Sequence, residues 1–350
     1  MVRQINPSLA RLWLKHDIRR YGTHNPIELT SLAEKELRVL DLLELGVTEE
    51  QLRDLPEITG ASKESVDRIV QTLGSRLVKT SSFLPEMGAS EVNRRFAEIS
   101  RLFLAENGDP AELLRGRRRT RVFLDSLSRT GLVIAKALDA SEIGRIITMD
   151  QARVKPSDTL SLGYERGKVG TQRAKAASAL MENSSLELHS RHSRTTDEIE
   201  LAILISNDVV NPLSYQTWMA RDVPHVSVCF DEVGVEVSQV VIPGQTPCLG
   251  CAELAKHAEP ERRVIAPQLL ALDRSNEDSA TVLFGASMIL TQALNFIDRT
   301  GETSWCYRLE RAGDAYRYRN ENASCGCRLV SEENSGHSSI RRPAGDPSPW

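Results

Sequence analysis

The chain has 350 residues, of which 40% are hydrophobic and 26% charged, and its formal net charge is −4. This length allows two domains and a tail, and the composition is that of a globular protein. The charge gives no reason to expect a nucleic acid as the partner. We see no apolar run approaching the roughly 20 residues of a membrane span, and no signal-peptide core near the N-terminus. We therefore expect a cytoplasmic protein whose cysteines are reduced, metal-bound or buried.

Residues 1–84 combine short strands with helices. Residues 12–21 and 27–30 are predicted as strands broken by polar turn residues. Apolar residues at helical spacing then predict three helices, over residues 33–43 with Thr30 or Ser31 as the cap, over 48–55 and over 62–77. This order predicts a small winged-helix-like α+β domain. A DNA-binding or dimerising winged helix stays open, although acids interleaved with the basic residues weaken the DNA alternative.

Residues 85–120 are predicted as a helical linker. The linker ends in a basic cluster, which either forms a solvated face or meets a phosphate group: Arg115, Arg117, Arg118 and Arg119. At the other end of the chain, residues 331–350 are rich in Ser, Pro, Gly and charge. Such a segment cannot bury enough apolar surface to order itself, so we predict a disordered tail there.

A strand, turn, helix and strand follow one another from Arg121 to Asp150, which is the order of a nucleotide-binding βαβ unit. A phosphate loop of this type needs glycines so that its backbone amides can approach the phosphate. Its three glycine positions are occupied here by Ser126, Ser128 and Gly131. Two added side chains crowd a phosphate, so the segment predicts either a weak nucleotide site or an empty structural unit.

The α/β pattern continues to about residue 330. An apolar strand over residues 200–206 ends at Asn207 and Asp208, and further strands are predicted over 223–228 and 235–241. A long apolar helix is predicted over 279–298. We therefore expect residues 121–330 to form a Rossmann-like domain with a mostly parallel sheet.

Two close cysteine pairs predict a metal site. They are Cys248-x-x-Cys251 and Cys325-x-Cys327. Two such pairs complete a closed tetrahedral Cys₄ shell for zinc, which leaves no open position and is therefore structural. The alternative is a set of reduced, buried thiols. The two remaining cysteines, at positions 229 and 306, are predicted to be core residues.

On these motifs residues 121–327 resemble the ThiF/MoeB/HesA family, the bacterial relatives of ubiquitin-activating enzymes. The resemblance implies ATP- and Mg²⁺-dependent adenylation of a carrier protein's carboxylate. It gives Asp150 the role of binding ribose and puts Arg173, within Gly170-Thr-Gln-Arg-Ala174, where a phosphate-binding lysine is expected. It makes Asp208 the magnesium ligand, with a shift of two residues, and the cysteine pairs the two halves of the family's zinc site. Arg173 and Asp208 are the catalytic candidates if the chain is active.

The chain departs from that family at the places where nucleotide is held. The glycine loop is degraded, arginine replaces lysine, and Lys155-Pro-Ser-Asp-Thr-Leu160 stands in place of a Ser-Asn-Leu-x-Arg-Gln motif. Binding of ATP and Mg²⁺ is therefore predicted to be weak or absent.

A narrower resemblance rests on residues 224–228 and 241–251, which are similar to actinobacterial ThiF-like partner proteins of cyclodehydratases in azole and azoline peptide biosynthesis. It implies a homodimer that binds the leader of a ribosomal precursor peptide and presents it to a modifying enzyme. Two other functions stay open: an active adenylyltransferase, and a winged-helix DNA-binding regulator.

Overall fold

The computed structural model describes residues 1–80, 94–103, 109–189, 198–256, 260–272, 274–320 and 327. Cys325 and the predicted tail, residues 331–350, lie outside the described residues.

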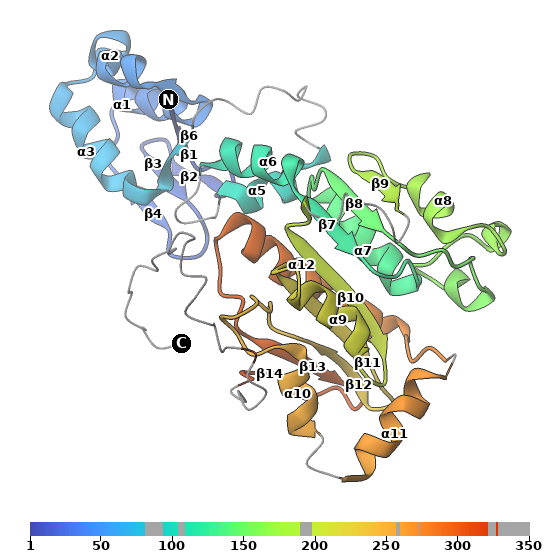
Figure 1. Cartoon of the computed structure of the whole chain (residues 1–350). Coiled ribbons are helices and arrows are strands. Elements are labelled where there is room, and N and C mark those ends of the chain that lie inside the picture. Colours follow the sequence, from blue (N-terminus) through green and yellow to red (C-terminus); the bar gives the residue numbers. More distant parts are fainter. Residues whose placement is uncertain are drawn as a thin grey trace.

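The N-terminal part of the chain builds two small three-stranded sheets and three helices around one apolar core (Figure 1). One sheet has the order β5-β1-β6 and the other the order β2-β3-β4. The elements are β1 (Val2–Ile5), β2 (Arg11–Lys15), β3 (Ile18–Tyr21), β4 (Ile27–Leu29), α1 (Glu34–Leu45), β5 (Val47–Thr48), α2 (Glu49–Thr59), α3 (Lys63–Leu73) and β6 (Leu77–Thr80).

The three predicted helices are present, but the expected cap of the first is wrong. The N-cap of α1 is Ala33, whose backbone N–H donates to the Glu36 carboxylate at 2.9 Å. Ser31 instead has a positive φ of 56° and lies in the preceding turn. The helix start therefore keeps the glutamate half of a capping box, whereas Ala33 has no hydroxyl to cap the helix.

Two further helices connect this part to the body of the protein. They are α5 (Phe96–Phe103) and α6 (Pro110–Arg119). The N-terminal part reaches α5 directly, because the Asn6 side chain donates to the Phe103 carbonyl at 2.8 Å and the Ser8 hydroxyl to the Ser100 carbonyl at 2.9 Å.

The body contains one eight-stranded sheet with the order β14-β13-β12-β11-β10-β7-β8-β9. The five strands from β11 to β9 run parallel, and β12, β13 and β14 are antiparallel. The strands are β7 (Arg121–Leu124), β8 (Arg145–Thr148), β9 (Ser185–Leu188), β10 (Leu201–Asn207), β11 (His225–Phe230), β12 (Gly234–Val237), β13 (Cys306–Glu310) and β14 (Ala315–Tyr318). The helices of the body are α7 (Arg129–Ala140), α8 (Arg173–Ser178), α9 (Pro212–Met219), α10 (Leu249–Lys256), α11 (Pro260–Leu270) and α12 (Ser279–Asp298).

Helices cover both faces of this sheet, so its central strands are buried on both sides. Alternate residues of β7 supply the two cores: Val122 and Leu124 pack in the cluster with α7 and α12, whereas Phe123 packs on the other face. There its ring centroid lies 4.6 Å from that of Trp218 in α9. The mostly parallel sheet agrees with the predicted α/β class.

Helix α12 is long and apolar enough to cross a membrane by length and composition alone. The expectation from the sequence that no apolar run approaches the length of a membrane span is therefore wrong. In this structure α12 packs against α7, β11 and β12. A Cβ on Gly285 would lie 3.0 Å from Val228 and 3.3 Å from Val235, so this helix lies close against the sheet.

Part of the basic cluster is structural. Arg117 is 1% exposed, and its guanidinium group makes two hydrogen bonds to the carboxylate of Asp298, at 2.9 and 2.5 Å. Arg118 pairs with Glu142 at 3.0 Å, and Arg115 with Glu112 at 2.5 Å. Arg117 is thus part of the core, whereas Arg115 and Arg118 form ion pairs closer to the surface.

We predict that Arg117→Met destabilises the protein by about 3–5 kcal/mol, because it leaves the Asp298 carboxylate buried without its cation. The thermal midpoint should fall by about 10 °C for a domain of this size. Arg115→Met, which removes a half-exposed pair, is the matched control and should cost less than about 1 kcal/mol. Equal midpoints for the two variants in a thermal scan would contradict this assignment.

Candidate functional site

The residues predicted to bind nucleotide come together at the carboxyl ends of the central strands of the sheet. From β7 the chain proceeds to β8 and β9 on one side, whereas β10 and β11 lie on the other side of β7. Ligands of open α/β sheets bind at such a switch point, outside the carboxyl ends of the strands. The loop after β7, Asp150 after β8 and Asp208 after β10 all occupy this place.

The turn between β7 and α7 keeps one feature of a phosphate loop. A Cβ on Gly131 would lie 1.9 Å from the Ser126 carbonyl oxygen, so only glycine fits at this position. Ser128 is the N-cap of α7, and its hydroxyl accepts from the Gly131 N–H at 3.5 Å. The turn thus retains the close packing of strand and helix, while its first two glycine positions carry side chains.

The N-terminus of α7 already holds an anion from the same chain. One carboxylate oxygen of Glu277 accepts from the Thr130 backbone N–H at 2.9 Å, from the Thr130 hydroxyl at 2.6 Å and from the Ser128 hydroxyl at 3.3 Å. The Arg129 side chain donates to the Glu277 carbonyl at 2.5 Å. Helix N-termini of this kind bind phosphate through the same groups, and here they are used by Glu277.

Asp208, the magnesium candidate, is also paired within the chain. Arg274 donates to its two carboxylate oxygens at 2.9 and 2.7 Å, and the Asn276 side chain donates at 2.9 Å. The Asn276 backbone N–H binds the Asn207 side chain at 2.9 Å. We call residues 274–277 the site segment, because this one stretch contacts both Asp208 and the start of α7.

The third group of candidates surrounds Arg173. Its guanidinium group donates twice to Asp158, both at 2.9 Å, and once to Asp150 at 3.4 Å. Asp150 in turn accepts from the Leu127 backbone N–H at 2.7 Å. The predicted ribose ligand and the predicted phosphate ligand thus contact each other, and Asp158 lies in the segment that replaces the family's Ser-Asn-Leu-x-Arg-Gln motif.

Asp125, at the end of β7, is a further acid of the site that the sequence analysis did not single out. Desolvation raises the pKa of its carboxyl group to about 8, and the negative charge of Asp150 adds to this effect. The Ile205 backbone N–H donates to it at 2.9 Å and opposes the shift. At neutral pH this carboxyl group is therefore mostly protonated.

Three of the four predicted zinc ligands come together. The Sγ atoms of Cys248 and Cys251 lie 3.9 Å apart, and those of Cys251 and Cys327 lie 3.5 Å apart. All three ligand atoms lie within 4.8 Å of one another. A tetrahedral site with Zn–S bonds of about 2.3 Å puts neighbouring sulfurs about 3.8 Å apart, so the three thiols fit a zinc ion. Cys229 and Cys306 are buried, as predicted for core residues.

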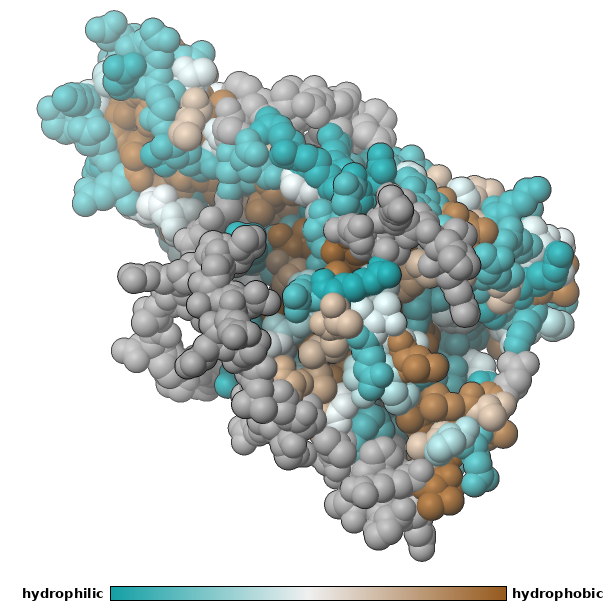
Figure 2. Space-filling view, viewed as in Figure 1, coloured by the Kyte–Doolittle hydropathy of each residue, from teal (hydrophilic) through white to brown (hydrophobic). Residues whose placement is uncertain are grey.

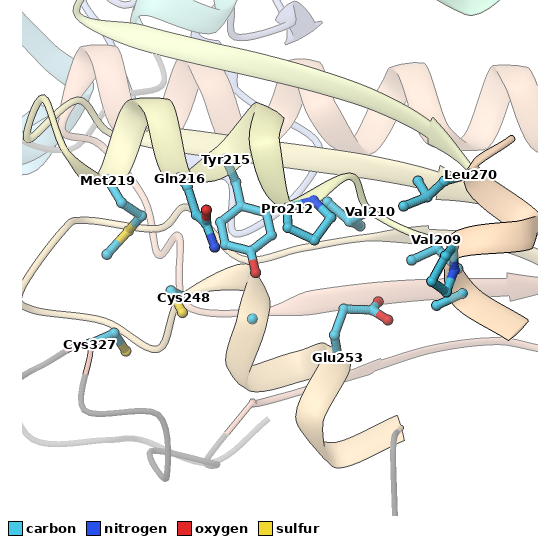
Figure 3. A pocket seen from close by; sticks show the side chains of 13 residues that line it. Val209, Val210, Pro212, Tyr215, Gln216, Met219, Cys248, Glu253, Leu270 and Cys327 are labelled. Carbon is cyan, nitrogen blue, oxygen red and sulfur yellow. The ribbon is translucent and has the colours of Figure 1, made fainter. Parts of the chain in front are cut away.

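A cavity of about 610 Å³ lies beside the cysteines (Figure 3). Its walls include Val210 and Tyr215, Leu270 of α11, and both Cys248 and Cys327. In Figure 2, apolar residues gather on the nearby surface of α11 at the lower right, where Val264 is 67% exposed. The cysteine cluster therefore forms part of the wall of an apolar cavity.

Sequence reasoning missed Arg274, Asn276 and Glu277. The signal was a polar run, residues 274–278, immediately before the long apolar helix. Nothing in that run identifies its partners, because they lie about 65 to 150 residues earlier in the chain.

A scan against protein families finds no match for this sequence, and neither does a search of curated proteins. Solved structures do match. Escherichia coli MccB has a TM-score of 0.65 at 12% identity, covering 96% of this chain and 100% of that one. MccB bound to AMPCPP and MccA has a TM-score of 0.65 at 10% identity, covering 93% and 98%.

The protein PaaA gives a TM-score of 0.59 at 16% identity, covering 78% of this chain and 97% of that one. These identities are low, so the matches speak only for the arrangement of helices and strands. Together with the switch-point sheet and the paired cysteines, they show that this chain has a ThiF-like fold.

Proposed function

We propose that this protein binds the leader of a ribosomal precursor peptide and presents it to a partner modifying enzyme, such as a cyclodehydratase. In this proposal the ThiF-like body is a scaffold whose nucleotide site is impaired. The proposal is supported by the structural neighbours, since MccB is described as a microcin C7 biosynthetic enzyme and was solved in complex with N-formylated MccA. A cytoplasmic location, expected from the sequence, and a homodimer, implied by the family resemblance, complete the proposal.

The nucleotide site is proposed to be impaired because the site segment already occupies the groups that would bind nucleotide. The Glu277 carboxylate receives the donors at the start of α7, and Arg274 neutralises Asp208. A phosphate brought within about 4 Å of Glu277 is repelled by about 4 kcal/mol per charge pair at an effective dielectric of about 20. Nucleotide therefore has to displace the site segment before it can use either group.

Peptide binding is assigned to the N-terminal part, as a winged-helix-like recognition domain. Strand β4 is at the edge of the sheet β2-β3-β4, and α3 packs beside it. Within the described part of the chain β4 pairs only with β3. An extended peptide can therefore add a strand along β4 and place alternate side chains towards α3, which is recognition by β-augmentation.

The cysteine cluster is assigned to one structural zinc ion, held by Cys248, Cys251 and Cys327 with Cys325 as the fourth ligand. Zinc supplies folding energy at such a site. In this proposal the ion links the start of α10 to the C-terminal segment. It has no catalytic role, so another protein modifies the bound peptide.

The second candidate is an active adenylyltransferase. It is favoured by neighbours with bound nucleotide, because MccB was solved with ATP and with AMPCPP. In that case Asp150, Arg173 and Asp208 become working residues, and the site segment has to move out of the site.

We predict that calorimetry with Mg·ATP finds no binding tighter than about 1 mM, which corresponds to about −4 kcal/mol. The double variant Glu277→Gln with Arg274→Ala should bind at least tenfold more tightly, because it removes the negative charge at the α7 N-terminus and the cation paired with Asp208. Glu302→Gln with Arg319→Ala removes a comparable pair on the surface and is the matched control. Micromolar binding by the unaltered protein, with peptide-dependent pyrophosphate exchange, would establish the adenylyltransferase instead.

A further inference from the structure

The opposite edge of the same small sheet carries exposed apolar side chains. All five residues of β2 are exposed, and Leu12, Trp13 and Leu14 are 38%, 73% and 49% exposed. Among the described residues β2 pairs only with β3. We define the β2 edge surface as these three apolar residues with Lys15 and Arg19.

Charge on this surface is positive, whereas the chain as a whole is negative. Residues 11–21 contain four basic residues and one acid, against a net charge of −4 for the chain. Two of the four are already neutralised, since Arg11 pairs with Glu44 at 3.1 Å and Arg20 with Glu28 at 3.5 Å. The guanidinium carbon of Arg19 lies 5.4 Å from the centre of the Trp13 ring. Lys15 and Arg19 therefore remain beside the apolar group against one acid, Asp17, so this stretch keeps a net positive charge.

An exposed edge strand with apolar side chains is normally covered or blocked. Here a register shift around Leu14 limits pairing to a short stretch, yet the large side chains of Trp13 and its neighbours stay in water. The exposed apolar side chains fit a surface that another chain covers, and the register shift limits the strand that can pair there to a short one.

We propose that the β2 edge surface binds an acidic, apolar extended segment of the modifying enzyme. The inference rests on the proposed function, in which the leader occupies β4. Because β2 and β4 are opposite edges of one sheet, the two peptides can bind at the same time. The small sheet then holds the precursor and the enzyme on either side of β3.

The charge of this surface argues against a second copy of the chain, a nucleic acid duplex or a membrane as the partner. A second copy of β2 would bring the cations Lys15 and Arg19 of both copies to one interface. A duplex or an anionic membrane is held by many basic contacts, about six to ten for typical DNA-binding proteins, and this surface offers two. Apolar contact by Trp13 and Leu12, steered by those two charges, is the recognition that the surface supports.

The test uses the full chain and a labelled synthetic octapeptide that alternates isoleucine with glutamate, titrated by fluorescence polarisation. The same peptide with lysine for glutamate should bind at least tenfold more weakly. Trp13→Glu should weaken binding of the acidic peptide at least tenfold. Ile58→Glu, at an exposed apolar position on α2, should leave it unchanged.

Equal binding by the Trp13→Glu variant, or equal binding of the two peptides, would overturn the inference. So would Trp13-dependent binding of phosphatidylserine vesicles or duplex DNA in place of the acidic peptide. Leader binding is measured on the same samples and should survive Trp13→Glu. Failure of the unaltered protein to bind the leader would instead reject the proposed function, whether or not the octapeptide binds.

Discussion

Replacing Cys248 and Cys251 together by serine is expected to release zinc and to lower the thermal midpoint by more than about 10 °C. The reason is that metal binding at a site of this kind is folding energy, with apparent values of about 10–16 kcal/mol in small zinc domains. The two thiols also lie in the apolar cluster with Trp218 and Tyr215, so the effect should reach the packing of α9.

Metal analysis of the unaltered protein should give close to one zinc per chain, and the double variant close to none. The control is Cys229→Ser, a buried cysteine of β11 that is not one of the three grouped thiols, which should keep the metal and lose less stability than the double variant. A metal-free protein whose thermal midpoint equals that of the zinc-treated protein would exclude a structural zinc site.

Proline at position 28 is expected to weaken leader binding at least a hundredfold. Glu28 is the middle residue of β4, and proline removes a backbone donor and distorts an edge strand. Glu28→Ala is the matched control, because it also removes the ion pair with Arg20 but keeps the backbone N–H. The leader should bind the alanine variant almost normally.

Zinc content and the thermal transition of the body should be the same in both variants, which shows that the substitution acts locally. Equal leader affinity for the proline and alanine variants would mean that the β4 edge is not used. Binding of duplex DNA with a steep salt dependence, and of no leader, would support a regulator instead.

The parts of the fold that could be predicted from the sequence are those with a strong local signal. The long apolar run at 279–298 gave α12 with its observed bounds, and the apolar run from residue 200 gave β10 within one residue. Strands β1, β5, β6, β9, β13 and β14 were missed, and none of them is longer than five residues. Short strands of this kind form because a neighbouring strand pairs with them, and their own sequence shows little of this.

The same limit applies to the site. The positions of Ser126, Ser128, Gly131 and Asp150 followed from the order of strand, turn and helix. The contacts of Glu277 with α7 and of Arg274 with Asp208 join segments far apart in the chain, and neither has a periodic signature. The degraded glycine loop predicted weak nucleotide binding, and only the structure identified the side chains that use the remaining donors.

The most direct test of the account is a polarisation titration of a labelled leader, taken from a precursor peptide encoded nearby, with the full chain in the presence and absence of Mg·ATP. Binding through the β4 edge with no use of nucleotide predicts one micromolar or tighter dissociation constant that is the same in both conditions. No binding at about 100 µM protein, or binding that appears only with Mg·ATP, would contradict a nucleotide-independent leader-binding scaffold.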